Sequence, residues 1–138
     1  MNLNQVTLPA LDIATSAAFY RTLGFRQIVA TPTYARFECS DGGATFSVHA
    51  VEAVPADTGF VVYFEHEALD GLVDELKGKG IEFTQDPTDQ RWLWREARLR
   101  DPAGNVICLY WGGENRRNPP WRITADPTFR PSKRSAPL

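Results

Sequence analysis

The feature that most constrains this chain is an internal duplication, because one order of predicted elements occurs twice at a spacing of about 55 residues. Each half predicts a strand, a helix and then three more strands, which together form a βαβββ module. A module on its own would expose one face of its sheet, so the two sheets are expected to come together. The predicted fold is therefore α+β, with two modules forming a curved, open, mixed-sheet cleft that suits a small-molecule ligand.

Strand alternation and helix-end signals predict the first module. Its expected strands cover residues 3–8, 25–30, 34–39 and 45–51. Asp12 is a good N-cap for a helix that runs to Leu23, because its carboxylate can accept a backbone N–H of the first turn. Gly24 then supplies the left-handed residue that ends the helix.

The second module shows the same signals. Its expected strands cover residues 59–64, 81–85, 92–99 and 106–111, with turns at 86–87 and 101–104. The apolar face of its helix is predicted from the spacing i, i+3, i+4 and i+7, which is occupied by Leu69, Leu72, Val73 and Leu76. Trp92 and Trp94 are predicted to lie on opposite faces of one strand, so at most one of them is expected to line the cleft.

Residues 1–111 are predicted to form a single domain, with modules at about 1–51 and 59–111. The remaining residues, 112–138, contain six basic and two acidic residues and are rich in proline. Proline opposes regular helix and sheet, so this segment is predicted to be a Pro/Arg-rich C-terminal arm, disordered from residue 125. Such an arm suits clasping a neighbouring subunit or covering a pocket mouth.

Composition argues against several classes of protein. A formal charge of -2 argues against a nucleic-acid-binding body, and no apolar run approaches the roughly 20 residues that cross a bilayer. Residues 1–5 lack the basic stretch and apolar segment of a secretory signal, so a cytoplasmic location is expected. Cys39 and Cys108 are too few for a disulfide scaffold and are expected to be reduced, packed thiols.

Three motifs carry a family resemblance. They are Asp12 with Phe19-Tyr20-x-x-Leu23-Gly24-Phe25, then Leu72-x-x-x-Leu76-x-x-x-Gly80-Ile81, then Arg100-Asp101-Pro102-Ala103-Gly104-Asn105. As a set they resemble the vicinal oxygen chelate superfamily of glyoxalases, bleomycin resistance proteins and extradiol dioxygenases. Their physical roles are packing, a positive φ and a tight turn, so they identify the fold and not the chemistry.

Metal-dependent members of that superfamily hold a divalent ion on four inward-facing strand positions, and the ion chelates two vicinal oxygens of the substrate. The resemblance places these positions on Gln5, on Phe46 or Ser47, on Val61 and on Cys108. Such ions prefer oxygen and imidazole donors, and Gln, Val and Cys with Phe or Ser cannot assemble a competitive site, so neither a metal nor another cofactor is expected. The alternative is a displaced metal site that draws on other donors, namely His49, Glu65, His66, Glu67 and Glu96.

The resemblance and strand alternation together predict the lining of a metal-free pocket. The expected ligand-binding residues are Gln5, Thr7, His49, Val61, Tyr63, Trp94, Cys108 and Tyr110. Arg98 and Glu96 are the candidate catalytic residues, with Arg98 holding an anionic oxygen and Glu96 acting as a general base. The competing interpretation is that these two side chains pair with each other and serve only the fold.

The sequence therefore predicts a ligand-binding or resistance-type protein, or a metal-free enzyme, whose small-molecule ligand can be anionic. The alternative function is a divalent-metal-dependent lyase, isomerase or dioxygenase with displaced ligands, and a purely structural module is the third. Whether the protein is an enzyme stays open at this point. A homodimer is expected, because two-module members of the superfamily pair and open sheets expose their edges, whereas nucleic-acid and membrane partners are not expected.

Overall fold

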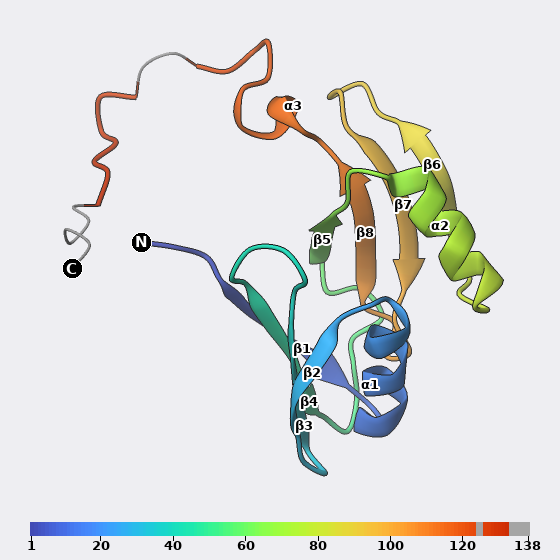
Figure 1. Cartoon of the computed structure of the whole chain (residues 1–138). Helices are drawn as coiled ribbons and strands as arrows, with labels where there is room; N and C mark the ends of the chain where they lie inside the picture. The colour runs from blue at the N-terminus through green and yellow to red at the C-terminus, as the bar shows by residue number, and fades with distance from the viewer. Residues whose placement is uncertain (124–125, 133–138) are drawn as a thin grey trace.

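The computed structural model describes residues 1–123 and 126–132, and it contains the two predicted βαβββ modules (Figure 1). The first module comprises β1 (Gln5–Ala10), α1 (Ile13–Thr22), β2 (Arg26–Ala30), β3 (Tyr34–Glu38) and β4 (Thr45–Ala50). The second comprises β5 (Val61–Glu65), α2 (Leu69–Gly78), β6 (Gln85–Asp89), β7 (Arg95–Arg100) and β8 (Val106–Trp111), and α3 (Glu114–Arg117) follows. The predicted α+β class and the duplication are confirmed.

Each module forms one mixed, four-stranded sheet. The strand orders are β1-β4-β3-β2 and β5-β8-β7-β6, and in each sheet the first strand runs parallel to its neighbour while the other pairs are antiparallel. One face of each sheet packs against apolar side chains of the core, and the other face remains open. Because alternate residues of a strand point to opposite faces, the polar and aromatic residues at alternate positions gather on the open faces.

The helix ends follow the predicted signals. The Asp12 carboxylate accepts the Thr15 backbone N–H at 2.9 Å, and Gly24 has a φ of 107°, so both predicted ends of α1 are confirmed. In α2 the buried residues are Leu69, Val73 and Leu76, which belong to the predicted apolar face.

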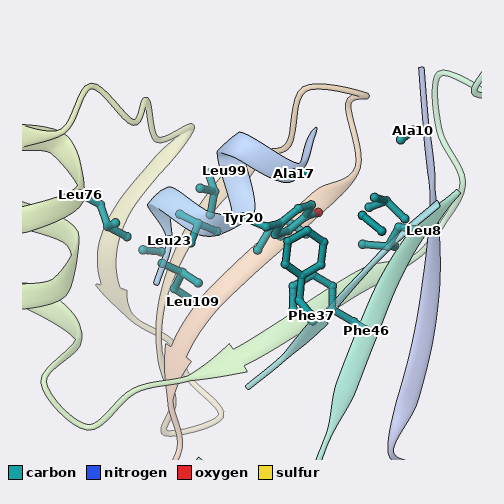
Figure 2. Close-up of a cluster of buried hydrophobic side chains, with 14 of the residues drawn as sticks. Leu8, Ala10, Ala17, Tyr20, Leu23, Phe37, Phe46, Leu76, Leu99 and Leu109 are labelled. Carbon is teal, nitrogen blue, oxygen red and sulfur yellow. The ribbon is translucent and has the colours of Figure 1, made fainter. Parts of the chain in front are cut away.

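The hydrophobic core is shared between the two modules. Figure 2 shows Tyr20 of α1 beside Phe37 and Phe46 of the first sheet, with Leu99 and Leu109 of the second module in the same cluster, near Leu23. The Tyr20 ring lies 4.9 Å from the Phe46 ring, measured between centroids. Burial of side chains from both modules in one cluster stabilises the two modules as one unit.

A hydrogen-bonded hub joins the first motif to the third. The Tyr20 hydroxyl donates to Asp101 Oδ2 at 2.6 Å, although the two residues are 81 positions apart in sequence. Asn105 Nδ2 donates to the same oxygen at 2.7 Å and to the Pro9 carbonyl of β1 at 2.9 Å. Asp101 Oδ1 accepts the backbone N–H groups of Ala103 and Asn105, so a carboxylate that is only 4% exposed is fully satisfied.

The predictions for the strand at residues 81–85 and for the turn at 86–87 are wrong. The strand expected at residues 81–85 instead runs from Gln85 to Asp89, through the pair 86–87 predicted as a turn. Pro87 is tolerated there because β6 is an edge strand whose register shifts between Gln85 and Thr88, so no ladder donor is required of it.

The arm was predicted to lack regular structure, yet it begins with the short helix α3 (Glu114–Arg117). This helix forms because the first prolines of the arm, Pro119 and Pro120, come only after it. The disorder predicted from residue 125 concerns a segment of which residues 125 and 133–138 lie outside the described residues. Within the described ranges, none of the helices has the length and apolar character needed to cross a bilayer.

The hub predicts a specific effect on stability. Tyr20→Phe should lower the free energy of unfolding by about 1–3 kcal/mol, because a buried carboxylate oxygen loses a donor. Tyr63→Phe is the control, since its hydroxyl is partly exposed and lies 3.4 Å from its one recorded partner, Arg98. Urea denaturation of both variants measures the difference, and equal small losses would show that the hub contributes little.

Candidate functional site

Three aromatic rings form a cluster on the open face of the second sheet. Tyr63 lies on β5, Tyr110 on β8, and Trp94 immediately before β7. Trp94 and Tyr110 are stacked with ring centroids 4.7 Å apart, and Tyr63 meets them edge-on at 5.9 and 5.5 Å. Tyr63 is 41% exposed, so the cluster reaches the protein surface and offers rings to a ligand.

An ion pair lies beside these rings. Arg98 Nη2 is 3.2 Å from Glu96 Oε1 and 3.4 Å from the Tyr63 hydroxyl oxygen, to which it donates. Glu96 is only 1% exposed, and its second oxygen accepts the Trp92 indole N–H at 2.7 Å. Both oxygens of this buried carboxylate are therefore occupied, which is the geometry of the structural interpretation. The Arg98 side chain remains 31% exposed, so part of its guanidinium stays accessible.

The prediction that Trp92 and Trp94 lie on opposite faces is wrong. β7 begins only at Arg95, and the preceding residues form a turn in which Leu93 has a φ of 67°. The Trp92 indole reaches Glu96, and Trp94 stacks on Tyr110, which is the register partner of Glu96, so both indoles reach the same face. The prediction had the parity wrong, because residues two apart in an extended segment point to the same side.

Cys108 lies next to the ion pair and is fully buried. The pKa of its thiol is raised to about 12, first by burial and then by the negative charge of Glu96, while the positive charge of Arg98 acts in the opposite direction. The thiol is therefore protonated near neutral pH and is a poor nucleophile. In the sheet register Cys108 is the partner of both Tyr63 and Arg98.

The first turn of the C-terminal arm forms a wall of the aromatic cluster. Glu65 Oε2 accepts the backbone N–H groups of Gly112 and Gly113 at 3.0 and 3.1 Å. The Trp94 indole N–H donates to the Asn115 carbonyl at 3.3 Å. A Cβ added at Gly112 would lie 3.1 Å from Trp94 Nε1, so glycine permits this close approach. Sequence reasoning missed this wall, although the adjacent glycines 112 and 113 after a strand were a visible signal.

The other predicted residues lie on the first sheet. Gln5 Nε2 donates to Ser47 Oγ at 2.8 Å, its Oε1 accepts the Thr45 hydroxyl, and Thr7 lies in register with Ser47 on the same face. His49 is exposed and lies in register with Tyr34. Val61, the remaining predicted residue, is the register partner of Val106 in the second sheet. The hydrogen bonds of Gln5 thus stay within the first sheet, and those of Arg98 within the second.

A separate groove of about 1090 Å³ lies between the end of α1 and α2. Its floor includes Phe25, Phe64 and Leu72, and of the predicted ligand-binding residues Tyr63 borders it. Phe25 and Phe64 contact each other at 4.6 Å between centroids and belong to the packing between the modules. This groove therefore continues the core outward and is a weaker candidate than the aromatic cluster.

The four positions that the resemblance assigns to a metal do not suit one. The Gln5 amide is engaged by Ser47 and Thr45, Val61 carries no donor, and the Cys108 thiol is held protonated by burial. In the part of the chain that the structure describes, no three side chains of His, Cys, Asp or Glu are grouped closely enough to hold an ion. The donors available at these positions therefore do not fit the divalent ion of the metal-dependent relatives.

Comparison with curated proteins gives a match to part of the chain. A relative from Bacillus subtilis (strain 168), the uncharacterized protein YraH, is 36% identical over 56 residues, a match that covers 40% of this chain and 44% of that protein. In this match the chain spans less than half the length of the curated relative.

Solved structures of low sequence identity share the fold of this chain. A bleomycin-binding protein complexed with bleomycin is 23% identical with a TM-score of 0.68, over 82% of this chain and 100% of that one. A bleomycin resistance determinant encoded on the transposon Tn5 is 23% identical with a TM-score of 0.69, over 80% and 98%. These likenesses support the fold. The family model described as Glyoxalase/Bleomycin resistance protein/Dioxygenase superfamily matches residues 2–109, and the chain belongs to that superfamily.

Proposed function

We propose that this protein binds an aromatic small molecule on the open face of its second sheet and acts as a ligand-binding or resistance-type protein without a metal ion. The observation that carries the proposal is the surface-reaching cluster of Tyr63, Trp94 and Tyr110. Aromatic side chains offer large, rigid contact areas and stack well on other rings. The bleomycin-binding and bleomycin resistance proteins among the structural neighbours support a binding role of this kind.

The ion pair beside the cluster defines the polar part of the proposed site. Glu96 has no free oxygen while Trp92 and Arg98 donate to it, so in this proposal it positions Arg98 and does not act as a base. The accessible part of the Arg98 guanidinium can donate to a ligand oxygen. A ligand with an anionic or other accepting oxygen next to an aromatic ring suits this arrangement best.

The alternative function is a divalent-metal-dependent lyase, isomerase or dioxygenase with displaced ligands. It is the weaker candidate because three of the four positions used by metal-dependent relatives carry an amide, a valine and a protonated thiol. Metal analysis of the purified protein separates the two functions. Stoichiometric nickel, zinc, manganese or iron that survives mild dialysis would favour the alternative.

The proposed site is tested by ligand titration monitored by tryptophan fluorescence, with bleomycin as the first probe. Trp94→Ala should weaken binding at least about tenfold, because the stacked ring that forms the platform is lost. Trp121→Ala is the matched control, since that indole lies exposed on the arm. Equal losses in both variants, or unchanged binding by Trp94→Ala, would contradict the assignment of this site.

The ion pair predicts a loss of stability on removal of its cation. Arg98→Ala should lower the free energy of unfolding by about 2–3 kcal/mol, less than for a fully buried pair because Arg98 is partly exposed and Trp92 still donates to Glu96. Arg26→Ala, which breaks the exposed pair with Glu38, should change stability little. If Arg98→Ala leaves thermal unfolding unchanged but abolishes ligand binding, the side chain is a ligand clamp and not mainly the partner of Glu96.

We further propose that the protein is a cytoplasmic homodimer. The edge strands β1 and β5 each have one unpaired backbone side, which favours association with a second chain. Sedimentation at tens of micromolar should give a mass near twice the chain mass of 15.5 kDa. A mass of a single chain under these conditions would rule out the dimer and leave the ligand site untouched.

A further inference from the structure

A row of hydrogen-bonded side chains crosses the open face of the first sheet, away from the aromatic cluster. Gln5 of β1 donates through Nε2 to Ser47 Oγ of β4 at 2.8 Å. Ser47 Oγ lies 2.5 Å from the hydroxyl oxygen of Tyr34 on β3, and Arg36 Nε donates to that same oxygen at 2.9 Å. The sheet register holds these residues side by side, because Arg36 is the strand partner of Ser47 and Tyr34 lies one step along the same face.

The protons of this row can be counted. Ser47 and Tyr34 each carry one hydroxyl proton, but only one hydrogen bond joins them. Ser47 is fully buried, so a spare proton there would have no acceptor, and a buried unsatisfied donor is costly. Ser47 therefore donates to Tyr34. The Tyr34 oxygen accepts twice, from Ser47 and from Arg36, and its own proton is left to donate outward.

Arg36 is held in place but keeps free donors. Its guanidinium carbon lies 5.4 Å from the centroid of the Tyr34 ring, and its Nε donates to the Tyr34 hydroxyl, so the side chain is fixed at two points. In the described residues, its two terminal nitrogens make neither a hydrogen bond nor a salt bridge. Glu38, the acidic residue two positions along β3, is instead paired with Arg26 at 3.3 Å.

We propose that Tyr34 and Arg36 form a second binding site, specific for a carboxylate, on the open face of the first sheet. The planar fork of the Arg36 guanidinium matches the two oxygens of a carboxylate, and one of these oxygens can also accept the Tyr34 hydroxyl proton. The two donors to the Tyr34 oxygen, Ser47 first and then Arg36, hold the pKa of this phenol below its usual value. A phenol of lowered pKa is the stronger hydrogen-bond donor to an anion. The site is distinct from the aromatic cluster and does not depend on it.

Sequence reasoning missed both residues, although alternation in β3 indicated them. Tyr34 and Arg36 alternate with the buried Ala35 and Phe37, so the polar members of the strand share the open face. No motif drew attention to this strand, and the proton count depends on Gln5 and Ser47, which come from two other strands.

The site is tested by NMR titration of the full-length ¹⁵N-labelled chain with sodium acetate, with sodium chloride at equal ionic strength as the reference. Acetate has no ring and therefore reports on the carboxylate site without a contribution from stacking. We expect saturating shifts of the Arg36 Nε–H and of the amides of Tyr34 and Ser47. Arg36→Gln should weaken binding at least about tenfold and Tyr34→Phe about fivefold, whereas Arg26→Gln, on the same sheet but paired with Glu38, should leave it unchanged.

Two outcomes of these titrations would overturn the proposal, and a third would support it. Shifts that do not saturate, or that persist in Arg36→Gln, would show general attraction of anions to basic residues. Saturating shifts confined to the surroundings of Arg98 would place the carboxylate in the site of the proposed function and remove this second site. Loss of bleomycin binding in Trp94→Ala with intact acetate binding would support two independent sites.

A second measurement tests the proton arrangement without any ligand. In a tyrosine absorbance titration, Tyr34 should ionise below the usual tyrosine pKa, whereas burial raises the pKa of Tyr20 and of Tyr110. The charged and titratable groups around Tyr34 are Arg36, His49 in register with it, and the pair of Glu38 and Arg26. Tyr34→Phe should remove the early transition and Ser47→Ala should move it to higher pH. An early transition that survives Tyr34→Phe would contradict the assigned direction of the hydrogen bonds.

Discussion

The fold depends on the buried carboxylate of Asp101. This group lies in the turn before β8, yet it accepts the hydroxyl of Tyr20 from the first module and the amide of Asn105, which also reaches the Pro9 carbonyl of β1. A buried carboxylate is tolerated only when its oxygens are well hydrogen-bonded, so Tyr20, the turn and β1 must be in place together. The hub therefore couples the docking of α1 to the closing of the last turn and holds the two modules at a defined distance.

The Asp101 hub and the aromatic core occupy the inner faces of both sheets. They therefore leave the opposite faces for ligand binding. Tyr20, Phe46 and Phe64 pack between the modules and leave the opposite face of each sheet uncovered. The two open faces differ in character, because the second presents stacked rings beside a shielded ion pair and the first presents a row of hydrogen-bonded side chains ending at Tyr34 and Arg36. A flat aromatic compound suits the second face, whereas a carboxylate suits the first.

The elements were predictable where local signals and tertiary packing agree, as at the Asp12 cap, at Gly24 and along the buried face of α2. Prediction failed where the chain departs from regular alternation. β6 was predicted too early in the chain, because an edge strand with a register shift can contain Pro87. The placing of Trp92 and Trp94 on opposite faces was a separate error, because residues two apart in a strand share a face. The wall formed by Gly112 was missed, because the paired glycines after β8 signal a close backbone approach but do not identify Trp94 as the residue approached.

The sequence by itself determined the duplication and the α+β class, because periodicity and turn chemistry are local properties that one strand or helix expresses alone. Its three motifs carried the resemblance to the superfamily. It also indicated Glu96, Arg98, Tyr63 and Tyr110 as residues that share one side of a sheet, since alternation is a property of each strand. Only the tertiary structure decided that Arg98 is paired with a buried Glu96, that the rings of Trp94 and Tyr110 are stacked, and that Tyr34 is hydrogen-bonded to both Ser47 and Arg36. Those features depend on distances between different strands and on burial, and both arise only when the sheets are assembled.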